Sequence, residues 1–164
     1  ERLARVAGGQ LDAAFVRAVE PVPGVRVLPL WADPLVAALP ASHPLAGRSE
    51  IGVGELAALP LALTERRNNP ALVDLVVGAS HEAGFEPLPG PVSGSLQDTL
   101  ATIGTRPLWT VVYASHARVL HNPRVAFVPF EAPGLALSTG LAVPAARRPP
   151  HLDILLLACG DHEN

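Results

Sequence analysis

Proline and glycine occur throughout the 164-residue chain and limit the length of any one helix or strand. There are 18 prolines and 14 glycines, and they follow no fixed period. Proline lacks the backbone N–H that helices and sheets use, and glycine favours turns. This distribution indicates many short elements joined by tight connections, and it argues against collagen or one long helix.

The composition is that of a folded domain with an aliphatic core. Hydrophobic residues make up 49% of the chain and charged residues 16%, which excludes intrinsic disorder. Aromatic residues are only 4%, so the core must consist of leucine, valine and alanine. The length allows one domain or two small lobes.

Several classes of function are excluded by missing residue types. The chain has no lysine, so it cannot form a lysine Schiff base or a phosphate-binding loop lysine. A single cysteine, Cys159, excludes an intrachain disulfide and a zinc site made of cysteines. The net charge of −3 gives no electrostatic footprint for nucleic acid.

Residue 1 is glutamate and the chain has no methionine, so we expect it to be part of a longer protein. The longest apolar run, residues 154–159, is too short to span a bilayer, and no signal peptide is visible. We therefore expect a cytoplasmic domain without a membrane segment.

Helical and strand patterns alternate along the chain. Residues 2–9 have the pattern of a helix that ends at two glycines, and residues 11–16 form an apolar run typical of a strand buried on both faces of a parallel sheet. Separate strands are predicted at residues 25–31 and 35–39. This alternation predicts an α/β fold with mostly parallel sheets. The remaining strands are predicted at residues 60–63, 109–113, 125–130 and 135–143.

Two helix starts carry clear capping signals. Asn69 precedes a proline and a helical apolar stripe that ends near residue 83, so we expect it to cap that helix. Ser95 is expected to cap a second helix over residues 96–103, with Asp98 in its first turn. A last helix should follow Pro150.

Four segments taken together resemble the effector-binding domain of LysR-type transcriptional regulators. Residues 9–17 read GQLDAAFVR, and residues 35–46 read LVAALPASHPLA. The other two are NPAL at residues 69–72, followed by AGFEP at 83–87, and LAVP at 141–144. Each motif is weak alone, but their order and spacing cover nearly the whole chain.

The resemblance implies a periplasmic-binding-protein-like α/β fold, with two lobes joined by two crossing strands and a small-molecule cleft between them. Lobe I would comprise residues 1–37 and 141–164, with its N-terminal part missing. Lobe II would comprise residues 38–140. One departure lies at residue 113, where a tyrosine replaces the usual proline and implies a different cleft lining.

The resemblance also implies partners. The sensor domains would form a homodimer through the helix at residues 72–83. Two expected helix starts and several arginines suit a carboxylate, so we expect the effector to be a small organic acid or similar anion. DNA would be bound only through an N-terminal helix-turn-helix that is not present in this chain.

The expected ligand contacts lie where strands end and helices begin, because ligands of open α/β sheets bind there. Arg66 lies four residues before the helix proline, as arginine does in members that respond to aromatic acids, but Arg66 and Arg67 could equally be a solvated surface pair. Trp109 could stack on a ligand or belong to the core. The residues expected to contact the ligand are Arg17, Leu39, Pro40, Arg66, Arg67, Asn69, Ser95 and Trp109.

Other functions have less support. A transport-type solute-binding module would share the fold, and a small enzyme on this fold is a remote alternative. The sequence shows no paired carboxylates or nucleophile motif, so we expect no catalytic residues, no metal site and no cofactor. His43 is expected to stabilise its own loop, and Cys159 to be buried.

Overall fold

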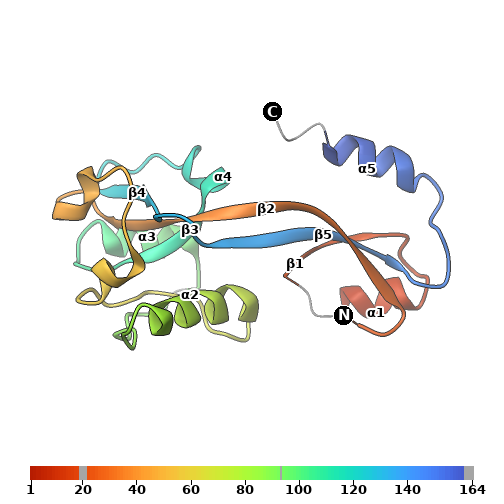
Figure 1. The fold of residues 1–164 in the computed structure, drawn as a ribbon, viewed down its shortest axis with the longest axis horizontal. Helices are drawn as coiled ribbons and strands as arrows, with labels where there is room; N and C mark the ends of the chain where they lie inside the picture. The colour runs from red at the N-terminus through yellow and green to blue at the C-terminus, as the bar shows by residue number, and fades with distance from the viewer. Residues whose placement is uncertain (19–21, 93, 161–164) are drawn as a thin grey trace. The chain divides into compact units, whose positions relative to one another are not determined.

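The computed structural model describes residues 1–18, 22–92 and 94–160. It divides into two compact units, which Figure 1 shows as a ribbon. Unit 1 comprises Glu1–Ala32 and Leu137–Asn164, and unit 2 comprises Asp33–Ala136. These boundaries lie four to five residues from those predicted for the two lobes, 1–37 with 141–164 and 38–140.

Unit 1 is built on an antiparallel strand pair. Strand β1 (Ala14–Arg17) pairs with β5 (Ala136–Pro144), and Ala14 lies opposite Ala142. The prediction of a parallel strand buried on both faces is wrong here, because Phe15 is 47% exposed while Ala14 is buried. An apolar run without alternation predicts burial, but it does not determine the direction of the partner strand. Two helices complete the unit, α1 (Arg2–Ala7) and α5 (Leu152–Gly160).

Strand β2 (Val25–Pro40) runs from unit 1 into unit 2 as one element of 16 residues. The sequence predicted two separate strands in this region. In unit 2, β2 pairs antiparallel with β3 (Thr110–Tyr113) and with β4 (Val125–Pro129). The predicted mostly parallel sheet is therefore wrong for the described residues, where parallel pairing is confined to isolated bridges such as Leu61 with Trp109.

The helices of unit 2 begin and end close to the predicted residues. Helix α2 spans Pro70–Glu82 and α3 spans Leu96–Ile103, while the short α4 (Ala114–Ala117) was not predicted. Both predicted caps are confirmed: Asn69 Oδ1 accepts from Leu72 N at 3.2 Å, and Ser95 Oγ accepts from Asp98 N at 3.1 Å.

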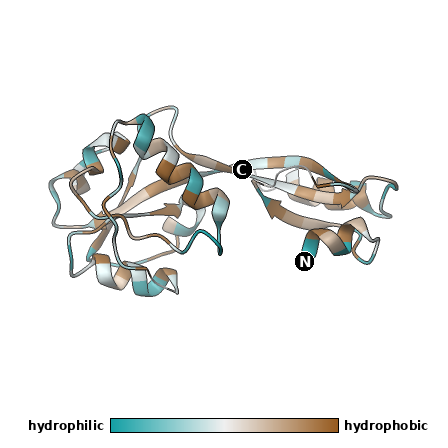
Figure 2. Cartoon of the chain, turned by 90° about the horizontal axis from the view of Figure 1, so that it is seen from below, coloured by the Kyte–Doolittle hydropathy of each residue, from teal (hydrophilic) through white to brown (hydrophobic). Residues whose placement is uncertain are grey.

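Helix α3 packs on the sheet of unit 2 and forms an aliphatic core with it. Figure 2 shows hydrophobic residues concentrated along these strands. Leu100 and Ile103 of α3 are almost fully buried, and so is Ala38 of β2. As the low aromatic content predicted, the cluster is aliphatic; its members are Val36, Ala38, Leu100, Ile103, Leu108, Val112 and Val125.

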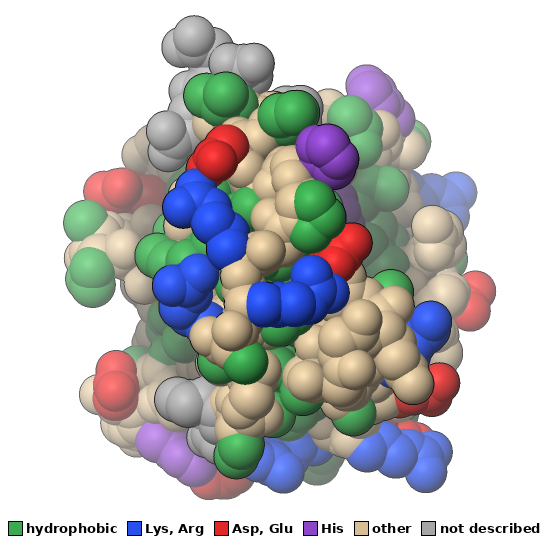
Figure 3. All heavy atoms as spheres, turned by 90° about the vertical axis from the view of Figure 1, so that its right-hand side faces the viewer, with side chains coloured by type: hydrophobic (Ala, Val, Ile, Leu, Met, Phe, Trp, Pro, Cys, Tyr) green, Lys and Arg blue, Asp and Glu red, His purple; other side chains and the backbone are tan. Residues whose placement is uncertain are grey.

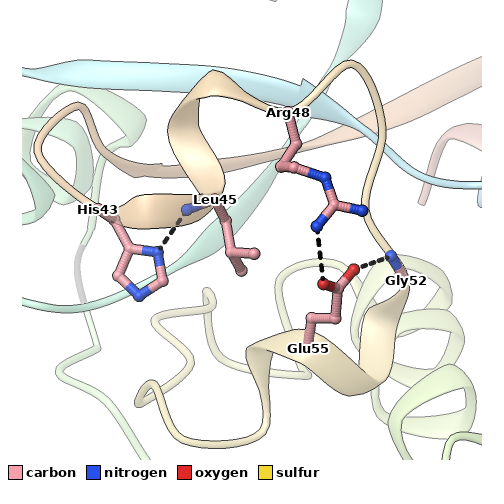
Figure 4. Close-up of polar contacts among 5 residues, drawn as sticks. All are labelled: His43, Leu45, Arg48, Gly52 and Glu55. Carbon is pink, nitrogen blue, oxygen red and sulfur yellow. Dashed lines mark hydrogen bonds and ion pairs between the residues drawn. The ribbon is translucent and has the colours of Figure 1, made fainter.

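A polar network closes the loop after β2 (Figure 4). His43 Nδ1 accepts from Leu45 N at 3.2 Å and caps the short 3-10 helix η1 (Pro44–Gly47), which confirms its predicted loop-stabilising role. In the next 3-10 helix, η2 (Val53–Leu56), Glu55 accepts from Gly52 N at 2.9 Å and pairs with Arg48 at 3.4 Å. These contacts give His43, Arg48 and Glu55 a structural role in the loop.

Exposed ion pairs connect surface segments of unit 1 that flank β1, β5 and α5. Arg147, after β5, pairs with Asp12, before β1, at 2.6 Å, and Arg148 pairs with Asp153 of α5. Arginine and acidic side chains lie side by side on the face of unit 1 that Figure 3 shows. Exposed ion pairs of this kind contribute little to stability.

Gly140 provides a test of the strand packing in unit 1. A Cβ at this position would lie 2.7 Å from Val27 Cγ1 and 2.9 Å from the Leu28 carbonyl oxygen. Gly140→Ala should therefore lower the free energy of unfolding by about 1–3 kcal/mol, measured by urea denaturation. In the control Gly78→Ala, the new Cβ meets no atom within 4 Å, and the helix should gain up to about 1 kcal/mol. Equal effects of both substitutions would contradict this packing.

Candidate functional site

Arg66 is held by an acidic partner on the neighbouring helix. Its Nε donates to Asp74 Oδ1 at 2.7 Å and its second guanidinium nitrogen donates to Asp74 Oδ2 at 2.7 Å. The two side chains are 68% and 52% exposed. The hydrogen bond from Arg66 lowers the pKa of Asp74, and the same bond raises the pKa of Arg66.

Arg67 has a similar arrangement. Its Nε lies 2.5 Å from Glu65 Oε2, and its side chain is 79% exposed. The two guanidiniums expected to bind an anion are thus paired with acids of the same chain. Of the two interpretations left open by the sequence, the contacts of Arg66 and Arg67 favour the solvated surface pair.

Three other predicted contacts have structural roles. Leu39 is fully buried in β2 opposite Ala126 of β4, and Pro40 ends the same strand. Trp109 is also fully buried, and its indole Nε1 donates to the Leu59 carbonyl at 3.1 Å. These positions favour core packing over ligand contact for Trp109.

Ser95, in contrast, lies on the wall of a cavity within unit 2. The cavity has a volume of about 260 Å³. Its walls come from the segment before α2, from the first turn of α3, and from β3 with the start of α4. Of the eight predicted contacts, it brings in Ser95 alone. The lining residues are Ala62, Leu63, Thr64, Leu72, Gly94, Ser95, Leu96, Thr99, Thr110, Val111, Val112, Tyr113 and His116. Ser93, two residues before Ser95, lies outside the described residues.

Hydroxyl groups dominate the polar part of this lining. Ser95 Oγ donates to Asp98 Oδ2 at 2.7 Å and accepts from Asp98 N at 3.1 Å. Thr99 Oγ1 donates to the Ser95 carbonyl at 3.0 Å, one turn back along α3. Thr64 Oγ1 accepts from Asn68 Nδ2 at 3.2 Å. These bonds fix the side chains in place, which is what a preformed binding site needs.

An aromatic pair forms another part of the wall. The rings of Tyr113 and His116 lie 5.5 Å apart in an edge-to-face arrangement, with an interplanar angle of 80°. Tyr113 is 8% exposed and His116 lies at the surface. Two signals in the sequence pointed here, the predicted ligand contact Ser95 and the tyrosine at position 113, where the resemblance implies a proline. Thr99 and Thr110 belong to no sequence motif that could have identified them as lining residues.

A larger cavity, of about 910 Å³, lies within unit 1. Its lining includes another predicted contact, Arg17, together with Trp31 and Cys159. The eighth predicted contact, Asn69, caps α2. Cys159 is buried, as predicted. The adjoining helix α5 also exposes Ile154 and Leu157, to 65% and 73%, but neither residue lines this cavity.

The unit 1 cavity has polar groups of its own, from Arg2, Arg17 and Thr139. We take the unit 2 cavity as the candidate site because several of its hydroxyl groups are held in place by hydrogen bonds.

The described residues contain no group of three or more histidine, cysteine, aspartate or glutamate side chains that could hold a metal ion. Within the same residues, no helix is long and apolar enough to cross a membrane.

Comparisons with known proteins agree on one family. The profile of the LysR substrate binding domain matches residues 1–162. The chain is 34% identical over 120 residues to the HTH-type transcriptional regulator TtuA of Agrobacterium vitis, a match that covers 67% of this chain and 38% of that protein. It is 37% identical over 82 residues to a probable hydrogen peroxide-inducible genes activator of Mycobacterium avium, covering 50% of this chain and 26% of that protein.

Solved structures share the fold. The Corynebacterium glutamicum OxyR C206 mutant superposes with a TM-score of 0.84 at 21% identity, over 98% of this chain and 50% of that one. The BenM effector binding domain with its effector benzoate gives a TM-score of 0.83 at 19% identity, over 98% of this chain and 72% of that one. These effector-binding domains have the two-lobed periplasmic-binding-protein-like fold that the motifs predicted.

The Arg66–Asp74 pair predicts a pH-dependent contribution to stability. Because the folded pKa of Asp74 is lowered, the contribution is fully present above the ordinary carboxyl range and is lost as the pH falls through the folded pKa. The difference in unfolding free energy between the wild type and Arg66→Ala should therefore be larger at about pH 6 than at about pH 2.

Urea denaturation at the two pH values measures this difference. Arg106→Ala, which removes a guanidinium from another exposed position, is the control for loss of charge. A difference for Arg66→Ala that grows as the pH falls would contradict the pairing.

Proposed function

The chain belongs to the LysR substrate-binding domain family, and from this membership we propose that it is the ligand-sensing part of a LysR-type transcriptional regulator. Both curated relatives described above are named as regulators of gene expression. The chain spans 38% and 26% of their lengths, so binding to DNA through another segment belongs to the proposal. A cytoplasmic location and a homodimer of sensor domains are parts of the same proposal.

The observation that carries the proposal is the cavity within unit 2. Its lining combines aliphatic side chains with hydroxyl groups that are already held by hydrogen bonds. Small-molecule sites are commonly built in this way, with mostly apolar walls and a few fixed polar groups. The BenM domain, which has the same fold, is described with its effector benzoate, and this supports a small organic ligand here.

Sensing requires that the ligand change an equilibrium between conformations. A ligand can do so only by its different affinity for the two conformations. We propose that occupancy of the cavity favours one arrangement of β3 and α3, since both elements contribute to its walls. Contacts of the ligand with Ser95 and Thr99 would change the position of α3, and contacts with Tyr113 would change the position of β3.

Other functions have weaker support. The regulators among the relatives favour regulation over a transport module of the same fold, and they give no support to an enzyme. The relative described as a probable hydrogen peroxide-inducible genes activator suggests redox sensing as another function. However, Cys159 is the single cysteine of the 164 residues. An exchange between two thiols within this segment is therefore not available.

A bulky side chain in the cavity should abolish ligand binding. Thr99→Phe places a ring in the cavity and should raise the Kd of a bound ligand at least about 100-fold, by steric exclusion. Thr102→Phe is the matched control, because Thr102 lies on the same helix outside the cavity and donates to the Asp98 carbonyl at 2.9 Å, as Thr99 donates to that of Ser95.

Calorimetry with compounds found in a thermal-shift screen measures these affinities. Equal affinity of the two variants would exclude this cavity as the site. If no metabolite in a broad screen stabilised the wild-type chain, the sensing function itself would be contradicted.

A further inference from the structure

We propose that the cavity of unit 2 selects an uncharged, partly apolar ligand with hydroxyl or amide groups over the corresponding carboxylate. This inference rests on the proposed function and specifies the chemistry of the same site. It replaces the organic-acid effector that the arginines of the sequence suggested.

The charges of the lining support this choice. Among the described residues that form the wall there is no arginine and no acid, and only the imidazole of His116 can become a cation. Arg66 and Arg67, two and three residues after Thr64 of the wall, pair with Asp74 and Glu65 in exposed ion pairs. Arg118, two residues after His116, is not among the lining residues. A carboxylate in the cavity would therefore lose hydration without gaining a permanent cation as its partner.

A carboxylate of the chain itself already lies in the first turn of α3. Helix N-termini attract carboxylates, and in this helix Asp98 occupies the first turn. Asp98 accepts from the hydroxyl of Ser95 at 2.7 Å, so the polar group that faces the cavity is engaged with a negative charge. A second carboxylate near Ser95 would be repelled by Asp98, whereas a neutral group would not.

The remaining wall suits a neutral molecule. Leu72, Leu96 and Val112 provide apolar surface for a ring or an alkyl chain. The Thr99 hydroxyl donates to the Ser95 carbonyl and can still accept from a ligand, and a threonine hydroxyl such as that of Thr110 can donate or accept, so the pair matches alcohols and amides without any change of charge. Apolar walls with neutral polar groups thus favour ligands that lose little hydration on entry.

Benzamide and benzoate are suitable probes, because they share a ring and a planar head group and differ in charge. We expect the wild-type chain to bind benzamide at least about tenfold more tightly than benzoate, measured by NMR titration at about pH 8. Thr99→Phe should abolish binding of benzamide, and Thr102→Phe should not.

A variant with an added positive charge provides the second part of the test. Thr64 lies on the wall, and Thr64→Arg adds a permanent cation that the lining lacks. The ratio of benzoate to benzamide affinity should rise at least about tenfold in this variant. An unchanged ratio, with circular dichroism and melting showing a folded variant, would overturn the proposal.

The outcomes separate this inference from the proposed function. If benzoate bound the wild type as tightly as benzamide or more tightly, and Thr99→Phe abolished that binding, the selection of neutral ligands would be overturned while ligand sensing would stand. If neither probe bound the wild type, the proposed ligand class would be overturned, and the broad metabolite screen would decide the sensing function separately.

Discussion

The backbone hydrogen bonds of β2 are the interaction on which unit 2 depends. From Val36 to Ala38 this strand has β3 on one side and β4 on the other, and Ala37, Ala38 and Leu39 are fully buried. Small and aliphatic residues on a strand with two partners let α3 pack closely on the sheet. The position of α3 against β3 then sets the walls of the cavity, because both elements contribute to its lining.

The sequence predicted best the features that depend on neighbours along the chain. The caps at Asn69 and Ser95, and the bounds of α2 and α3, follow from bonds over two or three residues, and the structure confirms them. Strand direction was predicted wrongly, because β1 and β5 are more than 120 residues apart and an apolar run contains no information about its partner.

The candidate site was harder to predict for a related reason. An arginine in the sequence suggests an anion-binding site. Whether that arginine is available to a ligand depends on which acidic side chain lies beside it in the folded chain. Arg66 meets Asp74 one turn into α2, and that contact is visible only once the helix is placed against the preceding loop. The threonines of the cavity are ordinary in sequence and become informative only when β3 and α3 bring them together.

NMR of the 15N-labelled chain titrated with benzamide tests the central claim most directly, since it locates the ligand residue by residue. We predict that the amides of Gly94, Ser95, Thr99 and Thr110 shift most, and that those of Arg66 and Arg67 shift little. Shifts concentrated at Arg66 and Arg67, or on α5 in unit 1, would contradict the assignment of the ligand to the cavity of unit 2.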